Sequence, residues 1–82
     1  MGKILSNFSE NKEVFIDSDF ITLTQFLKNE GIISTGGQAK FFLFDQEVFV
    51  NGELEERRGR KLYPEDTIEV LDQSYIIKHD SK

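Results

Sequence analysis

The most chemically distinctive segment of this sequence is a short cationic run. It consists of Arg57, Arg58, Gly59, Arg60 and Lys61. A guanidinium group is a planar fork of N–H donors that matches two phosphate oxygens at once, and glycine lets a loop backbone approach a ligand closely. The run therefore predicts a phosphate-binding loop. The alternative is a solvated loop whose charge is balanced by the neighbouring carboxylates Glu53, Glu55 and Glu56.

A second candidate for anion binding is the start of an expected helix. Gly36 and Gly37 stand where that helix begins, and uncapped backbone N–H groups at a helix start favour an anion. Lys40 adds a positive charge one turn later, and Gln38 adds a hydrogen-bonding side chain. The alternative is that the two glycines only shape the turn between two helices.

Aromatic side chains could add base stacking to these phosphate contacts. Phe41, Phe44 and Phe49 follow the glycine pair along the chain. For each of them a place in the hydrophobic core is the favoured interpretation, and Phe41 is the one that we keep open as a stacking surface.

The sequence offers no set of residues that is typical of an enzyme active site. The chain has no Cys and one histidine, His79, in a polar terminal segment. Carboxylate pairs occur only where we expect surface turns, so nothing near them would raise a pKa. We therefore expect no catalytic residue, no metal site and no cofactor.

Length and composition set the class of protein. With 82 residues the chain is long enough for one small domain. No apolar run approaches the ~20 residues of a membrane span. The absence of Cys fits a reducing cytoplasm. The formal net charge is −5, so any nucleic acid must be bound by a local cationic patch. Because the apolar residues can mostly be used in one core, we expect a monomer.

Local signals define one helix clearly. Thr22 and Gln25 have the spacing of a capping box, and Gly31 is suited to end the helix in the left-handed conformation. We therefore predict a helix from Leu23 to Glu30. The other expected elements are a strand over 13–17, a second helix from about 34 to 45 or 46, a strand over 47–50, a tight turn at Asn51-Gly52, the basic loop, a turn over 62–66, and strands over 67–71 and 74–78.

The order of these elements resembles the S-four domain, or alpha-L motif, and above all its short stand-alone bacterial members of YaaA type. The matching residues are Ala39, Leu43, Val48, Val50, Asn51-Gly52, Asp66-Thr67-Ile68-Glu69-Val70 and the segment Arg57-Arg-Gly-Arg-Lys-Leu62. The resemblance implies an α+β fold in which two short helices pack on a small, mostly antiparallel sheet. It also implies an RNA-binding domain over residues 13–78, flanked by a flexible arm at 1–12 and a polar tail at 79–82.

The function that follows is recognition of structured RNA, with ribosomal RNA or an assembling ribosomal particle as the expected partner. The contacts would be phosphate contacts from the basic loop and the start of the second helix. The RNA-binding residues would be Arg57, Arg58, Arg60, Lys61, Lys40, Gln38, Gly36 and Gly37. Two alternatives remain open: a β-grasp carrier-type domain, although the sequence lacks the Gly-Gly tail of such carriers, and a protein-interaction module whose acidic surface meets a basic partner.

Overall fold

A five-stranded sheet forms the body of the protein in the computed structural model, which describes residues 11–80. The strand order is β1-β7-β6-β3-β4; β1 runs parallel to β7, and the other neighbours are antiparallel. The bounds are β1 Asn11–Ile16, β3 Phe49–Val50, β4 Glu53–Leu54, β6 Thr67–Val70 and β7 Gln73–His79. The mostly antiparallel sheet that we predicted is confirmed.

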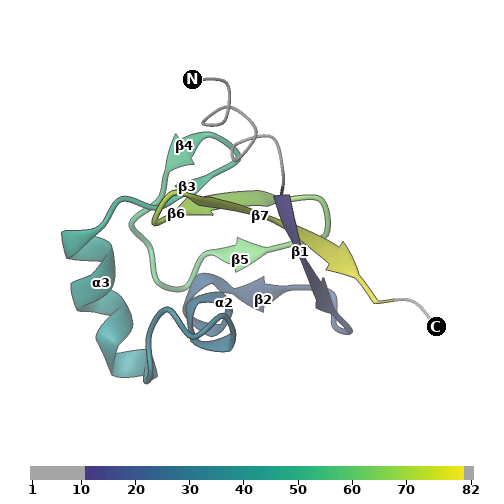
Figure 1. The fold of residues 1–82 in the computed structure, drawn as a ribbon. Helices are drawn as coiled ribbons and strands as arrows, with labels where there is room; N and C mark the ends of the chain where they lie inside the picture. The colour runs from purple at the N-terminus through teal and green to yellow at the C-terminus, as the bar shows by residue number, and fades with distance from the viewer. Residues whose placement is uncertain (1–10, 81–82) are drawn as a thin grey trace.

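Helices and a second, two-stranded sheet complete the α+β fold. The helical segments are α2 Leu23–Asn29, the 3₁₀ turn η1 Gly36–Gln38 and α3 Ala39–Asp45; the second sheet pairs β2 Ile21–Thr22 with β5 Lys61–Leu62. In Figure 1, α2 and the β2–β5 ribbon lie on one side of the large sheet, and α3 stands at the end of the molecule away from β1.

The core lies between the large sheet and α2. Leu23, Phe26 and Leu27 are fully buried at the i, i+3, i+4 positions that define one helix face. The Phe26 ring meets Tyr75 of β7 edge-on, with 5.0 Å between ring centroids. Each such buried side chain stabilises the fold by about 1.5–3 kcal/mol. The core thus fixes α2, and the segments attached to it, against the sheet.

Both ends of α2 are formed as the sequence predicts. The Thr22 hydroxyl accepts from the Gln25 N–H, and the Gln25 side chain accepts from the Thr22 N–H. At the other end Gly31 has a φ of +76°, while the Gly31 N–H donates to Lys28 O and the Ile32 N–H to Leu27 O. These two bonds form a Schellman motif, which satisfies carbonyls that the helix itself leaves unpaired.

The Asn51-Gly52 turn is also confirmed. It connects β3 to β4 with φ values of +53° and +85°, which are those of a type I′ hairpin turn. The Asn51 side chain extends this hairpin to the next strand: its Oδ1 accepts from the Thr67 N–H at 2.9 Å, and its Nδ2 donates to Asp66. The turn that carries the chain toward the basic loop is therefore attached to β6.

Several predicted boundaries are wrong. The first strand begins at Asn11 instead of residue 13, and the strand predicted over 47–50 covers only residues 49–50. The segment Lys61–Leu62, expected to be irregular, is strand β5. Two-residue strands have too little sequence to show alternation, so only their partner segments define them. Of the predicted arm, residues 1–10 lie outside the described residues, as do residues 81–82 of the predicted tail.

Candidate nucleic-acid interface

The backbone of the basic loop is held by the first turn of α2. The Leu23 N–H donates to Arg60 O at 2.8 Å, and both the Thr24 N–H and the Thr24 hydroxyl donate to Arg58 O, at 3.1 and 3.0 Å. A helix leaves its first N–H groups without an intrahelical partner, so the loop carbonyls satisfy them here. The loop is consequently fixed in position by a helix that is itself fixed by the core.

Glu55 organises the side chains of this loop. It is only 6% exposed, and its N–H donates to Val48 O. Its carboxylate accepts two side-chain bonds from Arg57, both at 3.0 Å, one from the Arg57 N–H at 2.9 Å and one from Arg60 at 2.6 Å. A buried carboxylate with paired guanidinium donors is a strong, directional arrangement. Arg57 and Arg60 are therefore held by one internal anion.

These contacts lower the pKa of Glu55. The hydrogen bond from the Arg57 side chain is the largest cause, and further bonds from the Arg57 backbone and from Arg60 act in the same direction, while burial opposes them. The pKa falls from 4.5 to about 2, so Glu55 is ionised at every physiological pH. The same contact raises the pKa of Arg57. The two arginines and the glutamate thus form a permanently charged cluster.

A groove runs between α3 and the basic loop. Its lining residues come from both segments: Lys40, Phe41, Leu43 and Phe44 from α3, and Glu56, Arg57, Arg58 and Gly59 from the loop. The tertiary structure therefore brings Lys40 next to two arginines that follow it by 17 and 18 positions in the sequence. We call this the α3–loop groove.

A second groove continues from the first on the other side of the loop. It is lined by Arg57, Gly59, Arg60, Lys61 and Tyr63, so the two grooves share Arg57 and Gly59. Lys61 lies over the Phe20 ring, with 4.9 Å from Nζ to the centroid, and Phe20 in turn contacts Tyr63. Together the grooves form a basic band, which we define by its cations: Lys40, Arg57, Arg58, Arg60 and Lys61.

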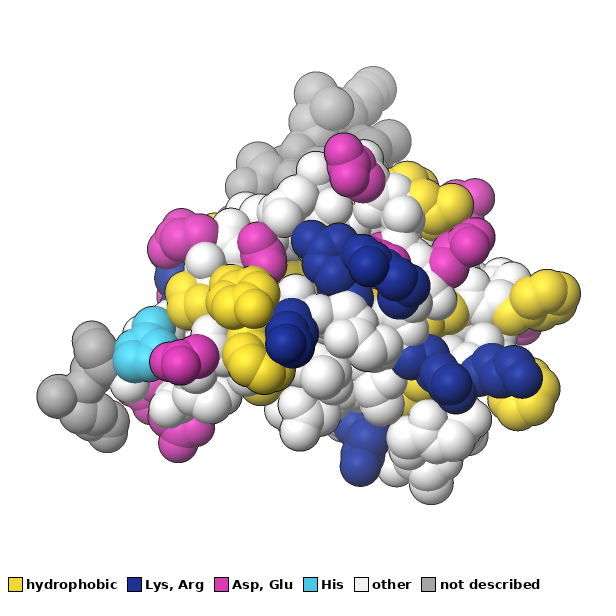
Figure 2. Space-filling model, turned by 180° about the vertical axis from the view of Figure 1, so that it is seen from behind, with side chains coloured by type: hydrophobic (Ala, Val, Ile, Leu, Met, Phe, Trp, Pro, Cys, Tyr) yellow, Lys and Arg dark blue, Asp and Glu magenta, His cyan; other side chains and the backbone are white. Residues whose placement is uncertain are grey.

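Figure 2 shows Lys and Arg side chains spread across the middle of one face, with hydrophobic side chains near both ends of this band and Asp and Glu mostly nearer the edges. Within residues 11–80, three cations of the basic band, Lys40, Arg58 and Lys61, take part in no ion pair. All three are exposed. They are the charges of the band that an external anion could meet without first competing with Glu55.

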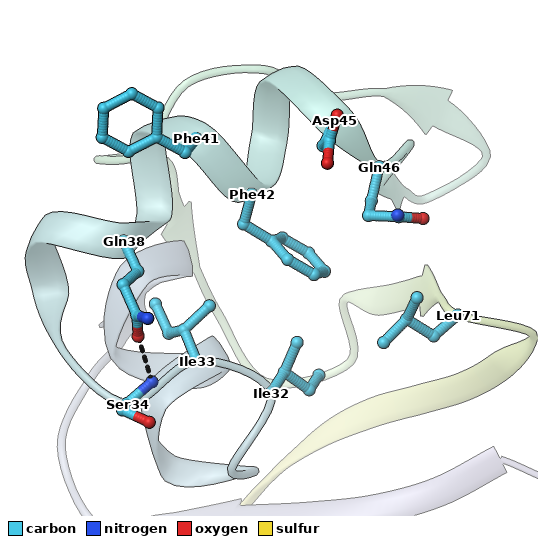
Figure 3. A pocket seen from close by; sticks show the side chains of 9 residues that line it. All are labelled: Ile32, Ile33, Ser34, Gln38, Phe41, Phe42, Asp45, Gln46 and Leu71. Atoms are coloured by element: carbon cyan, nitrogen blue, oxygen red, sulfur yellow. Dashed lines mark hydrogen bonds between the residues drawn. The ribbon is translucent and has the colours of Figure 1, made fainter.

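Gln38, at the start of the second helix, lines a different recess from the two grooves of the basic band. Gln38 Oε1 accepts from the Ser34 and Thr35 N–H groups, at 2.6 and 3.0 Å. Gln38 lines a recess on the other side of α3, where Phe42 points toward Ile32 and Leu71, while the Phe41 ring lies at the outer edge and points away (Figure 3). The structure therefore does not bring Gln38 into the basic band.

Gly36 lies next to a residue that holds the basic loop. A Cβ placed on Gly36 would lie 3.7 Å from the Thr24 methyl group, and Thr24 is the residue that holds Arg58. Gly37 has open space around it apart from Thr35. The helical run begins as a 3₁₀ turn and continues as a seven-residue α-helix. A side chain at Gly36 would thus make only an ordinary contact with Thr24, so the start of the second helix lies beside α2 without requiring a glycine there.

The assignment of Phe41 and Phe44 to the core is wrong. They are 71% and 91% exposed, whereas Ala39 and Leu43 of the same helix are buried. Because α3 packs at the end of the sheet, only one narrow face of it meets the core. The face that packs on the core is the one with i, i+3, i+4 spacing, Ala39, Phe42 and Leu43, and the two other phenylalanines do not widen it.

Sequence reasoning missed two features of the interface. Glu55 was interpreted only as a balancing surface charge, and its burial had no local signal beyond its place two residues before Arg57. The sequence predicted no contact between Phe20 and Tyr63, which was placed only in the turn over 62–66, because the two lie 43 positions apart and meet through the β2–β5 pairing.

A comparison with protein families agrees with this architecture. Residues 14–78 match the family model of the S4 domain. The chain belongs to this family. It is also similar to the probable ribosome maturation protein RlbA of Bacillus subtilis (strain 168), with 53% identity over 57 residues that cover 70% of this chain and 80% of that protein. The small stand-alone S-four type inferred from the sequence is therefore confirmed.

The S-four match covers the segments that build the interface, from β1 through the basic loop to β7. The match is to the S-four family that the sequence predicted. It does not support the alternative of a β-grasp carrier-type domain. Within the part of the chain that the structure describes, no helix is long and apolar enough to cross a membrane. The same residues contain no group of three or more His, Asp or Glu side chains arranged to hold a metal ion.

Proposed function

We propose that this S-four protein binds structured RNA, namely ribosomal RNA or a ribosome-assembly particle, through phosphate contacts from its basic band. The observation that carries the proposal is the meeting of Lys40 with Arg57 and Arg58 across the α3–loop groove. Phosphate contacts orient a protein on RNA without reading its sequence, so base specificity would be low. The name of the B. subtilis relative, which refers to ribosome maturation, supports the choice of RNA.

The cations of the band have two different roles in this proposal. Arg57 and Arg60 are held by Glu55, so they present fixed N–H donors and part of their charge is already balanced. Arg58, Lys61 and Lys40 carry charge that is not paired within residues 11–80. We propose that the second group provides most of the attraction and the first group the geometry. Gly36 and Gly37 keep their predicted role as a neighbouring backbone anion contact.

Salt dependence tests this proposal directly. Each phosphate contact contributes a slope of about −0.7 to −0.9 to a plot of log binding constant against log salt concentration. With all five cations of the band engaged, the protein should show a slope of roughly −3.5 to −4.5. The combined variant Lys40→Ala, Arg58→Ala, Lys61→Ala should flatten that slope by about 2–3. Fluorescence anisotropy with a labelled, structured ribosomal RNA fragment measures both values.

The matched control is Lys12→Ala. Lys12 is an exposed cation of β1 that is paired with Glu30 and lines neither groove of the band. Its removal changes the net charge but should leave the slope almost unchanged. Equal slopes for the parent and the triple variant would refute the basic band as the RNA-binding surface.

Light scattering of the same samples tests the expectation of a monomer.

A further inference from the structure

The two exposed phenylalanines of α3 need an explanation that packing does not supply. Phe41 and Phe44 lie three positions apart, so their Cα atoms are offset by roughly 4.5 Å along the axis of α3. Both line the α3–loop groove, whose other wall carries Arg57 and Arg58. Large aromatic side chains this exposed are a common feature of surfaces that bind a partner.

We infer that the α3–loop groove takes unpaired nucleotides of the bound RNA, with their bases against Phe41 and Phe44 and their phosphates on Lys40, Arg57 and Arg58. This inference rests on the proposed function and narrows its substrate to RNA that carries a bulge, a loop or a single-stranded end. Bases that are stacked in a helix offer no free π-face to a protein, whereas unpaired bases stack readily on aromatic side chains.

The composition of the groove favours a nucleotide over a protein segment. Four of its eight lining residues are charged, three of them positively: Lys40, Arg57, Arg58 and Glu56. The centre of a protein–protein interface is depleted of charged residues, while a nucleotide combines an apolar ring face with an anionic phosphate. Aromatic rings and cations facing each other across one groove match that combination.

The loop wall is also rigid enough to define the groove before a ligand arrives. The Arg58 carbonyl is held twice by Thr24, and Arg57 is held by the buried Glu55. The opposite wall is fixed through Leu43 and Ala39, which are buried in the core. Little ordering is therefore needed when the nucleotide binds, which preserves affinity. The recess on the other side of α3, drawn in Figure 3, lacks any cation and does not meet these conditions.

The test compares two fluorescein-labelled RNA duplexes that differ only in a bulge of a few unpaired adenines. The parent protein should bind the bulged duplex more tightly than the continuous one. The double variant Phe41→Leu, Phe44→Leu keeps apolar side chains but removes the rings. It should lose about 5- to 150-fold in affinity for the bulged RNA, which corresponds to 1–3 kcal/mol, and should bind the continuous duplex as the parent does.

A second variant gives a readout that a change in stability would not produce. The chain contains no Trp, so Phe44→Trp introduces a single indole at a position that is 91% exposed. Its fluorescence should be quenched by the bulged duplex at the same midpoint as the anisotropy signal, and not by the continuous duplex. The variant should retain the affinity of the parent, since tryptophan also stacks on bases.

The outcomes separate this inference from the proposed function. Equal affinity of the double leucine variant and the parent for bulged RNA, with the salt slope retained, would overturn the stacking groove and leave the basic band in place. Failure of the parent to bind either RNA would overturn both proposals. Loss of a concentration-dependent dimer in the leucine variant, without any effect on RNA binding, would assign the two phenylalanines to a protein contact instead.

Discussion

Replacing Glu55 by Gln should destabilise the whole domain, although Glu55 lies in a loop rich in exposed charges. The lowering of its pKa from 4.5 to about 2 corresponds to about 3 kcal/mol of stability at neutral pH. Solvent screens part of this effect because the Arg57 side chain is 74% exposed, so we expect a loss of about 2–3 kcal/mol. That is a large share of the ~5–15 kcal/mol by which domains are usually stable.

The pH dependence of the unfolding free energy shows whether the ionised carboxylate of Glu55 causes this stabilisation. Below pH 4.5 the unfolded Glu55 binds a proton while the folded Glu55 still does not, so the stability of the native protein falls as the pH drops. The contribution is complete above pH 4.5 and is lost as the pH approaches about 2. The difference in unfolding free energy between the parent and Glu55→Gln should therefore be greatest near neutral pH and vanish near pH 2.

Urea unfolding followed by far-UV circular dichroism, repeated across this pH range, measures that difference. The expected change near neutral pH should also lower the melting temperature by roughly 10–20 °C. Glu56→Gln is the matched control, because Glu56 is the next carboxylate in the chain and is exposed. If the two variants have the same stability at every pH, the carboxylate of Glu55 does not organise the loop and the reasoning from its buried contacts is refuted.

Three further substitutions test the local structure around the interface, each by urea or thermal unfolding. Glu65 has a φ of +81° after Pro64, so Glu65→Gly should remove left-handed strain and raise stability by about 0.5 kcal/mol; a loss of stability would contradict this. Thr22→Ala removes the side-chain cap of α2 and should cost about 1 kcal/mol, whereas an unchanged midpoint would argue against the capping box. Asn51→Ala leaves the Thr67 N–H without its partner and should cost about 1–3 kcal/mol, and a loss of only a few tenths would show that this link is not needed.

Much of the fold could be predicted from the sequence because its signals are local. The capping residues of α2, the glycine that ends it and the Asn51-Gly52 turn each act within a few positions, and the structure confirms all three. Strands β6 and β7 were found for the same reason, since alternating apolar residues such as Ile68 and Val70 define a buried face without reference to other segments.

The cationic residues of the interface could also be identified from the sequence, but their contacts with other side chains could not. A charge run shows which side chains are available, and it does not show that Arg57 and Arg60 share one buried carboxylate. Exposed loop charges usually add little to stability, but the buried carboxylate of Glu55 makes this loop an exception. Burial of Glu55 depends on the segments that cover it, so no pattern in its own neighbourhood distinguishes it from the exposed Glu56.

Only the tertiary structure decided which residues face the interface. Strand β5 exists because Leu62 pairs with Ile21, a residue 41 positions earlier, and that pairing brings Lys61 to Phe20. The phenylalanines of α3 fit a core face by spacing alone, but the sheet offers this short helix too little surface to bury all of them. Sequence periodicity gives the faces that a helix could bury, and the space that the other elements leave determines which one it does.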